Sequence, residues 1–494
     1  MLLIGYDIGS SSVKASLVDA ADGTVLAKTQ YPQTEMAIDA PKAGWAEQAP
    51  ASWWTNLCQA TKALLQESQA DKEDIKAIGI SYQMHGLVVV DKDNQVLRPS
   101  IIWCDSRAVS IGDQAFKSLG ETYCLEHYLN SPGNFTASKM RWVIQNEPSV
   151  SAKADAIMLP GDYIALKMTG ERSTTISGLS EGVLWDFKEQ GLATELLNHY
   201  GIDRELIPEI RPTFSNQGTL HQAAAAELGL RIGTPVTYRA GDQPNNALCL
   251  NVLHPGQVAA TGGTSGVVYG VVDRPVFDPA SRVNGFAHVN YTKQTPNVGV
   301  LLCINGAGIQ YNWLRQQVAQ NQFSYPEMEQ MAAKIPVGAA GLSILPFGNG
   351  AERVLENKDI GARICNLQFN RHETAHLIRA GLEGIAFSFV YGLQIMRKMG
   401  ISINHLRVGN DNLFQSAIFS NTIATLTGVE IEVVETTGAI GAAKAAGVAV
   451  GAFDHLEEAL GNTETVNMFG PEANKDVYES AYQRWEAQLK QAIL

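Results

Sequence analysis

The sequence predicts an α/β protein built from two lobes of similar topology. Apolar strand-like runs alternate with helix-like segments, as where LLIGYDI and VKASLVD precede WWTNLCQATKALLQES. This alternation is typical of α/β architecture. Two turns rich in glycine and hydroxyl side chains, IGSSSV at 8–13 and GGTSGV at 262–267, lie about half a chain apart. Because apolar strands flank both turns, we expect one turn in each lobe, facing a shared ligand cleft.

Length and composition support two closely packed lobes. The chain has 494 residues, which exceeds one ordinary hydrophobic core. Its 45% of hydrophobic and 18% of charged residues are typical of a folded globular enzyme. A turn signal at residues 254–256 predicts an N-terminal lobe at 1–252 and a C-terminal lobe at 253–494. Because no low-complexity linker is present, we expect the lobes to move about a hinge.

Charge and cysteine usage exclude several classes of partner. The net charge of -13 disfavours nucleic acid and anionic membranes as partners. An anionic ligand must then be held by backbone amides, Mg²⁺ and single cationic side chains. The six scattered cysteines include no CxxC pair, so we expect reduced, mostly buried thiols. With no leader-like segment and no apolar run near ~20 residues, a cytoplasmic location is expected.

The first turn combines a carboxylate with small residues. Asp7 ends a strand, and Gly9-Ser10-Ser11 follow before Lys14 begins the next strand. Small residues let several backbone N–H groups face one phosphate, and a carboxylate can hold Mg²⁺ through its water shell. A plain hairpin turn explains the same residues.

The second half offers further turns for a nucleotide. No GxxxxGK[ST] occurs, so a Walker loop is excluded. The turn at 261–266 could wrap a phosphate, although a structural hairpin is an equal alternative. In LRVGNDN, Gly409 and Asn410 precede a helix-like segment, a position suited to a nucleotide phosphate or ribose. The small residues of 438–452 predict tight helix packing.

Asp242 is the candidate general base. It follows the strand-like PVTYRAG and precedes the helix-like ALCLNV, and thus lies beside a helix N-terminus. The helix dipole favours a carboxylate there by ~0.3–1 kcal/mol, and N-capping would explain the same residue. Phosphoryl transfer has a loose transition state, so a modest base within reach of the attacking hydroxyl is adequate.

Polar side chains at two other turns suit a polyol. Segment 77–97 has apolar runs on both sides of a polar turn, which predicts a hairpin with a functional tip. The WCDSR segment adds an aromatic ring, an acidic side chain and a basic side chain, those of Trp103, Asp105 and Arg107. A polyol needs donors, acceptors and an apolar cover. A structural histidine and a surface ion pair of Asp105 with Arg107 are alternatives. The candidate substrate-binding residues are Gln83, Met84, His85, Trp103, Asp105 and Arg107.

Eight segments in order resemble the FGGY carbohydrate kinase family, closest to its xylulokinase branch. They are IGYDIGSSSVK, GWAEQ with Trp53-Trp54, ISYQMHG, WCDSR, FTASKMRWV, AGDQPNNA, GGTSG and GAIGAA. The resemblance runs from residue 2 to about 450. It implies two actin-like, ribonuclease-H-like lobes, with sugar held mainly by the first lobe and ATP mainly by the second.

The resemblance also implies roles for single residues. Asp242 matches the catalytic base, Asp7 the carboxylate on the Mg²⁺ side, and Met84-His85 the sugar-contacting segment. The QMHG unit favours phosphorylation of D-xylulose to D-xylulose 5-phosphate in pentose catabolism. Gly263 and Thr264 match the phosphate turn. The candidate ATP-binding residues are Gly9, Ser10, Ser11, Lys14, Gly263, Thr264, Gly306, Gly409 and Asn410.

The chain departs from the family pattern in two places. The adenosine turn has Gly409-Asn410-Asp411-Asn412 where the family usually has GGG with a nearby serine, which affects the adenine contacts. After the base, DQPN replaces the DNAAG of many xylulokinases, and a GDQ start also resembles glycerol kinases. Kinases for ribulose, gluconate or glycerol therefore remain alternatives, as does a non-enzymatic actin-like sugar sensor. The sequence leaves a homodimer open.

Overall fold

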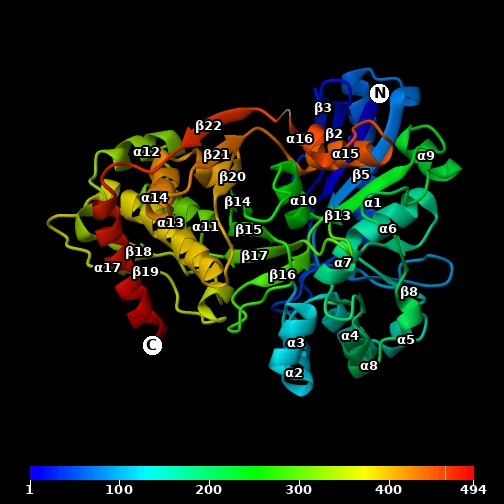
Figure 1. The fold of residues 1–494 in the computed structure, drawn as a ribbon, viewed down its shortest axis with the longest axis horizontal. Helices are drawn as coiled ribbons and strands as arrows, with labels where there is room; N and C mark the ends of the chain where they lie inside the picture. The colour runs from blue at the N-terminus through cyan, green and yellow to red at the C-terminus, as the bar shows by residue number, and fades with distance from the viewer. Residues whose placement is uncertain (462) are drawn as a thin grey trace.

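A five-stranded mixed sheet organises the first half of the chain. In this computed structural model, which describes residues 1–461 and 463–494 (Figure 1), the strand order is β13-β5-β1-β2-β3. The strands are β1 (Leu2–Ile8), β2 (Val13–Asp19), β3 (Val25–Tyr31), β5 (Ile75–Tyr82) and β13 (Val236–Gly241). β1, β2 and β3 are antiparallel neighbours, whereas β5 runs parallel to β1 and to β13.

A seven-stranded sheet organises the second half, in the order β16-β17-β15-β14-β20-β21-β22. Its strands are β14 (Gln257–Gly262), β15 (Gly266–Val272), β16 (Asn284–Ala287), β17 (Val298–Ile304), β20 (His405–Gly409), β21 (Ile431–Val434) and β22 (Thr465–Phe469). β14, β15 and β17 are antiparallel neighbours, whereas β20 runs parallel to β14 and to β21.

The two sheets share one topology. The five strands β21-β20-β14-β15-β17 repeat the order and the directions of β13-β5-β1-β2-β3. The turn between β1 and β2 then corresponds to the turn between β14 and β15. This repetition confirms the predicted pair of similar α/β lobes, each with its own turn. The predicted division at residue 252 falls between the sheets and stays a prediction.

Helices cover both sheets (Figure 1). Those of the first half are α1 (Pro50–Ser68), α2 (Val109–Leu119), α3 (Glu121–Tyr128), α4 (Thr136–Asn146), α5 (Pro148–Ser151), α6 (Pro160–Thr169), α7 (Ile176–Glu181), α8 (Thr194–Tyr200), α9 (Gln222–Leu228) and α10 (Asp242–Cys249). Those of the second half are α11 (Gly308–Trp313), α12 (Tyr325–Ala333), α13 (Thr374–Lys398), α14 (Ala417–Thr427), α15 (Gly438–Ala449), α16 (Leu456–Gly461) and α17 (Lys475–Ile493). None of the helices in the described part of the chain has the length and apolarity to cross a membrane.

Helix α15 belongs to the second half but packs on the first sheet. A Cβ atom added to Gly5 of β1 or to Gly79 of β5 would overlap with the α15 backbone. The small residues of both partners therefore permit this close approach, as the predicted tight helix packing requires. Alternate residues of a strand face opposite sides of the sheet. Asp7, two residues after Gly5, consequently points to the α15 side of the sheet.

The predicted hairpin at 77–97 is wrong, although both of its strands exist. β5 lies between β1 and β13 and has no free edge for a third neighbour. The following strand, β6 (Val88–Val90), pairs instead with β8 (Ala156–Met158). Apolar runs on both sides of a turn predict two strands but do not specify their partners. The Gln83-Met84-His85 segment therefore connects two sheets.

The two halves are joined at the edge strand β16. Ser177 Oγ of α7 donates to Ala287 O at 3.1 Å, and Ser180 Oγ accepts from Ala287 N at 2.9 Å. Asn130 Nδ2 donates to Gly285 O at 2.7 Å. Side chains of the first half thus satisfy backbone groups of β16 that no strand pairs with.

All six cysteines are free, and three of them, Cys58, Cys124 and Cys249, are buried. The expected reduced thiols are present, but only half are buried.

The short strand pairs are β4 (Glu47–Gln48) with β7 (Ser100–Ile101), β9 (Ser173–Thr174) with β12 (Glu209–Ile210), β10 (Trp185–Asp186) with β11 (Gly191–Leu192), and β18 (Ser343–Leu345) with β19 (Arg363–Cys365).

Candidate active site

Three parallel strand ends bring Asp7, Gln83 and Asp242 to one edge of the first sheet. The last residues of β1 and β13 both align with Tyr82, the last residue of β5. Ligands of open α/β sheets bind at this kind of edge, beyond the carboxyl ends of parallel strands. The sequence placed these residues in separate motifs, and the strand register brings them together.

Asp242 is a half-buried acid at the start of α10. Gly241 is the N-cap, so Asp242 occupies the first helical position and does not cap the helix. Burial and the negative charge of Asp7 raise the pKa of Asp242 to about 7, although hydrogen bonds from Gln243 act in the opposite direction. A carboxyl group with this pKa can exchange a proton near neutral pH.

Asp7 and Asp242 form a site that lacks positive charge. Ser81 Oγ donates to Asp7 Oδ1 at 3.2 Å. No ion pair within the described residues includes Asp7 or Asp242. Nor does the described chain contain a cluster of three His, Cys, Asp or Glu side chains arranged to hold a metal. One or two carboxylates are sufficient for Mg²⁺ that is also held by phosphates, so the pair fits that ion.

The turn between β1 and β2 contacts Gln48 and Trp103. Gly9 N donates to Ser12 O at 3.0 Å and closes the turn. Ser10 O accepts from Gln48 Nε2 at 2.6 Å, and Ser10 Oγ accepts from Trp103 Nε1 at 3.3 Å. Ser11, by contrast, is exposed.

Lys14 connects this turn to the second half. Its side chain is exposed, and its positive charge partly offsets the effect of burial, which raises the pKa of Asp411. Lys14 and the 409–412 turn of the second half are therefore near neighbours.

The turn between β14 and β15 consists of Gly263, Thr264 and Ser265, which have small side chains. Gly308 N donates to Gly263 O at 3.0 Å, and Ile309 N donates to Thr264 O at 3.1 Å. Gly306 N donates to Glu352 Oε1 at 3.0 Å, which fixes the loop that precedes α11. The structure thus brings Gly306 close to Gly263 and Thr264, although Gly306 lies more than 40 residues further along the sequence.

Gly409 ends β20 and Asn410 follows it, at the same edge of the second sheet. A Cβ atom added to Gly263 would lie 3.9 Å from Asn412 Nδ2, which places the 409–412 turn beside the β14–β15 turn. The exposed Asn410 side chain donates through Nδ2 to Glu435 Oε2 at 2.9 Å. The Asn410 amide therefore already has a hydrogen-bond partner, the Glu435 carboxylate.

The two edges meet at the start of α15. Asn245 Nδ2 of α10 donates to Gly438 O at 2.9 Å. A Cβ atom added to Gly438 would lie 3.1 Å from Asp7 Oδ2. Because Gly438 has no side chain, the N-terminal end of α15 approaches the Asp7 carboxylate closely.

Gln83 and Met84 are 2% and 3% exposed and lie at the end of β5. Gln83 Nε2 approaches Gln48 Oε1 at 3.4 Å, and Gln83 Oε1 has no hydrogen-bond partner in the described chain. An unpartnered buried acceptor is costly unless a ligand or water satisfies it. The Gln83 amide is therefore available to a polar ligand.

His85 adopts a left-handed backbone conformation, with φ of 53°. Its Nδ1 lies 3.2 Å from Glu181 O, and its ring centroid lies 4.9 Å from that of Phe135 and 5.9 Å from that of Phe286. Burial and the charge of Lys139 lower the pKa of His85 to about 3. His85 is therefore neutral, and one ring nitrogen can donate while the other accepts.

Asp105 and Arg107 bind each other in the structure, and their contacts with a sugar stay a prediction. Asp105 is fully buried, and its carboxylate accepts from Arg107 Nε, Arg107 Nη2 and Ala46 N at 2.6–3.0 Å. Arg107 also pairs with Glu47 at 2.7 Å and stacks on Trp45. The two side chains satisfy each other, as the ion-pair alternative expected, although the pair is buried and not on the surface. Trp103, which is 51% exposed, remains accessible.

Three polar residues at this edge had no role in the predicted site. Gln48 contacts Ser10, Gln83 and Trp53, and the GWAEQ segment was its only sequence signal. Lys139 is fully buried, and its Nζ donates to His85 O at 2.9 Å and to Ile102 O at 3.0 Å. Glu181 lies behind Gly241 and gave no signal, because its segment, STTISGLSEG, contains no recognisable motif.

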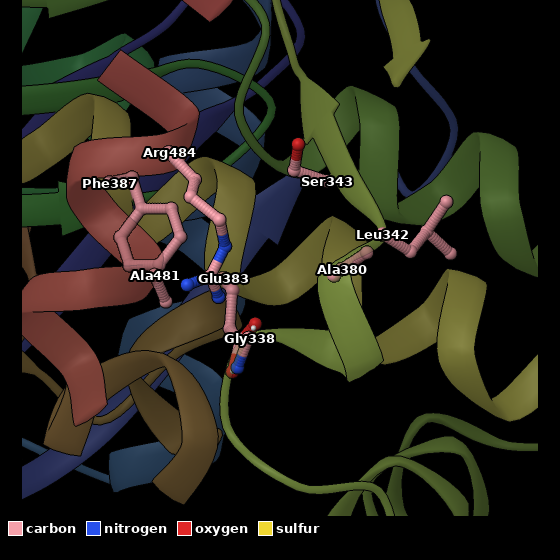
Figure 2. A pocket seen from close by; sticks show the side chains of 9 residues that line it. Gly338, Leu342, Ser343, Ala380, Glu383, Phe387, Ala481 and Arg484 are labelled. Carbon is pink, nitrogen blue, oxygen red and sulfur yellow. Dashed lines mark hydrogen bonds between the residues drawn. The ribbon is translucent and has the colours of Figure 1, made fainter. Parts of the chain in front are cut away.

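Two cavities in the second half lie away from these residues. The first, of about 10 Å³, lies between α13, α17 and the Gly338–Ser343 loop, where Glu383 and Arg484 point inward (Figure 2). It is large enough for a water molecule at most. The second, of about 250 Å³, is lined by the turn before β14, the end of β15 and the segment after α13. Neither includes a predicted ligand-binding residue.

Two equivalent lobes, one with carboxylates at its strand ends and the other with glycine and hydroxyl turns, define an actin-like two-domain protein. Residues 2–249 match the N-terminal domain, and residues 258–450 the C-terminal domain, of the FGGY family of carbohydrate kinases. The chain belongs to this family and is a kinase.

Individual members of the family resemble the chain over nearly its full length. It is 30% identical over 470 residues to the xylulose kinase of Bacillus subtilis (strain 168), which covers 92% of this chain and 90% of that one. The xyloylose kinase from Brucella ovis superposes with a TM-score of 0.90 at 26% identity, over 99% of each chain. Plasmodium falciparum glycerol kinase with ADP is 20% identical, with a TM-score of 0.89 over 100% of this chain and 98% of that one, and shares the fold.

Proposed function

We propose that this kinase transfers the γ-phosphoryl group of ATP to the 5-hydroxyl of D-xylulose. The single observation that carries the proposal is the placement of Asp242. It lies at the carboxyl edge of the first sheet, beside Asp7, and its pKa is raised to about 7. In this proposal lobe 1–252 binds the sugar and lobe 253–494 binds ATP.

Asp242 acts as the general base. Its carboxylate accepts the proton of the 5-hydroxyl as the hydroxyl oxygen bonds to the γ-phosphorus, and the bond from phosphorus to the leaving ADP oxygen breaks. In a loose transition state most of the rate enhancement comes from positioning and charge neutralisation. The base therefore contributes a limited part, and its proton passes to solvent after the product leaves.

The second half would hold the phosphates. Gly263 and Thr264 lie in a turn without large side chains, and Gly308 supports that turn from behind. Backbone N–H groups of such a turn can bind phosphate oxygens. Gly9, Ser10, Ser11 and Lys14 would approach from the first half. Mg²⁺, held by the phosphates and by Asp7, would neutralise charge that develops during transfer.

Xylulose is the substrate that the sugar-side residues favour. Met84 offers an apolar surface, and the neutral His85 ring, whose Nδ1 faces Glu181 O, offers an acceptor at Nε2 next to the unpartnered Gln83 amide. Relatives named xylulose kinase that align over most of the chain give independent support. Trp103 would cover the sugar from the exposed side.

A substrate panel tests the proposal. Purified protein with MgATP is offered D-xylulose, D-ribulose, gluconate and glycerol, and ADP release is measured by a coupled assay. We expect the highest kcat/KM with D-xylulose. A clear preference for another polyol would replace the substrate but keep the kinase, and ATP hydrolysis that no polyol stimulates would contradict both.

A further inference from the structure

Glu181, the last residue of α7, touches both candidate groups of the first lobe. Its backbone oxygen lies 3.2 Å from His85 Nδ1. A Cβ atom added to Gly241 would overlap with Glu181 Oε2 and lie 2.7 Å from Met84 Cγ. The Glu181 carboxyl group therefore packs directly against the backbone residue that precedes Asp242. One residue thus connects His85 to Asp242.

The carboxyl group of Glu181 has no charged partner. The residue is fully buried, and neither of its carboxyl oxygens has a hydrogen-bond partner within the described part of the chain. Arg239, the nearby cation, pairs through Nε with Asp162 Oδ1 at 3.1 Å. Each element that packs against Glu181 contributes a titratable or charged group. These groups are Tyr82, His85, Asp162, Arg239, Asp242 and Tyr269.

A buried carboxylate without a cation or hydrogen bonds is strongly disfavoured, so the group retains its proton. Burial raises the pKa of Glu181 most, and the charges of Asp242 and Asp162 add to this effect, whereas the Tyr82 hydroxyl and the His85 backbone act in the opposite direction. Asp242 is less buried than Glu181, so Asp242 loses its proton at the lower pH. Loss of the Glu181 proton would then put a second negative charge behind the base and oppose the approach of a phosphate.

We propose that Glu181 is a positioning residue that acts in its uncharged form and holds His85 and Asp242 in register. This inference rests on the proposed function, because it assumes that Asp242 accepts the proton of the sugar. Plain core packing is the alternative role. The two roles differ in their effect on pH dependence, because a packing residue has no reason to alter it.

The test compares Glu181→Gln, which keeps the shape and stays neutral, with Glu181→Ala. In the wild-type enzyme kcat/KM for D-xylulose should fall at high pH as Glu181 ionises. We expect Glu181→Gln to keep the acidic limb of this profile, to lose the alkaline limb and to retain activity within about threefold. Glu181→Ala should lower kcat/KM for the sugar by about tenfold or more, with an unchanged KM for ATP.

Infrared spectroscopy gives a second readout that needs no turnover. The difference spectrum between wild-type protein and Glu181→Gln should contain a band of a protonated carboxyl group that is lost in the variant, and it is recorded at pH 9, where Asp242, with a pKa of about 7, is ionised. Glu383→Gln is the matched control, because Glu383 is a buried acid of the second lobe that pairs with Arg379. This control should leave the pH profile unchanged.

Two results would overturn the inference. One is an acidic limb that moves to lower pH in Glu181→Gln, since that shift means a negative charge was removed. The other is an alkaline limb that persists in Glu181→Gln with no loss of the infrared band. If wild-type protein does not phosphorylate xylulose, the proposed function fails, but the infrared comparison still decides the charge of Glu181.

Discussion

The two lobes have the same five-strand topology but different chemistry at equivalent strand ends. β1 ends in Asp7-Ile8, whereas its counterpart β14 ends in Thr261-Gly262 and leads to Gly263. β13 and its counterpart β21 are both followed by an acid, Asp242 and Glu435, but Glu435 accepts a hydrogen bond from Asn410. The first lobe thus presents Asp7 and Asp242 together, and the second presents a glycine turn with Asp411 and Glu435 beside it. The scaffold fixes where the strand ends meet, and single side chains decide whether an edge suits proton transfer or phosphate binding.

The largest effect is expected from the Asp242→Asn substitution. Removal of the base should reduce kcat by about two to four powers of ten and leave sugar binding largely unchanged. Turnover is measured by ADP release, and sugar binding by calorimetry. Asp411→Asn is the control, since it removes an acid at the equivalent edge of the second lobe. A similar loss in both variants would mean that the lobes do not divide the chemistry as proposed.

The next effect concerns pH. Asp242 must be ionised to accept a proton, and its pKa in the free enzyme is about 7. Therefore kcat/KM for the sugar should rise with pH up to about 7, and should be about a hundredfold lower two pH units below it. Initial rates at low sugar concentration from pH 5 to 9 check this. A profile that is flat across neutral pH in the wild-type enzyme would remove Asp242 from this role.

A smaller effect is expected on folding stability. An acid with a pKa that is raised in the folded state destabilises the protein above its unfolded pKa of about 4, and the full cost is reached above about 7. Asp242→Asn should therefore raise the free energy of unfolding at pH 8 by roughly 2–4 kcal/mol, with little change at pH 4. Urea denaturation without ligands measures both values. Equal stability of variant and wild type at pH 8 would contradict the raised pKa.

The smallest effect is expected in the second lobe. Thr264→Val removes a hydroxyl from the β14–β15 turn but leaves its backbone N–H groups. The KM for ATP should rise by about tenfold at most, because the backbone makes most of the phosphate contacts. The KM for the sugar should not change. An effect on the sugar KM alone would place the nucleotide elsewhere.

Much of the fold could be predicted because local patterns determined it. The alternation in LLIGYDI and the repeated glycine turns predicted strands and two lobes, and the structure has both. The partner of a strand was harder to predict. Segment 77–97 has the same apolar pattern whether its strands pair with each other or with β1 and β8. Likewise, the small residues of 438–452 predicted close packing but not that their partner is the first sheet.

The site was predictable where a motif lies on a strand end. Asp7, Gln83 and Asp242 follow apolar strands, and the register brings them together. The buried pairing of Asp105 with Arg107 could not be predicted, because it depends on the distant Trp45 segment, which no local pattern reveals. Glu181 was missed because an acid beside serine and glycine residues is ordinarily expected to be exposed.

The most direct measurement is a crystal structure of the enzyme with D-xylulose and a non-hydrolysable ATP analogue. The account predicts that an Asp242 carboxylate oxygen lies within about 2.6–3.2 Å of the sugar 5-hydroxyl. It also predicts the terminal phosphate at the Gly263-Thr264 turn, in line with that hydroxyl. A sugar whose hydroxyls all lie away from Asp242, or a phosphate bound outside this turn, would contradict it.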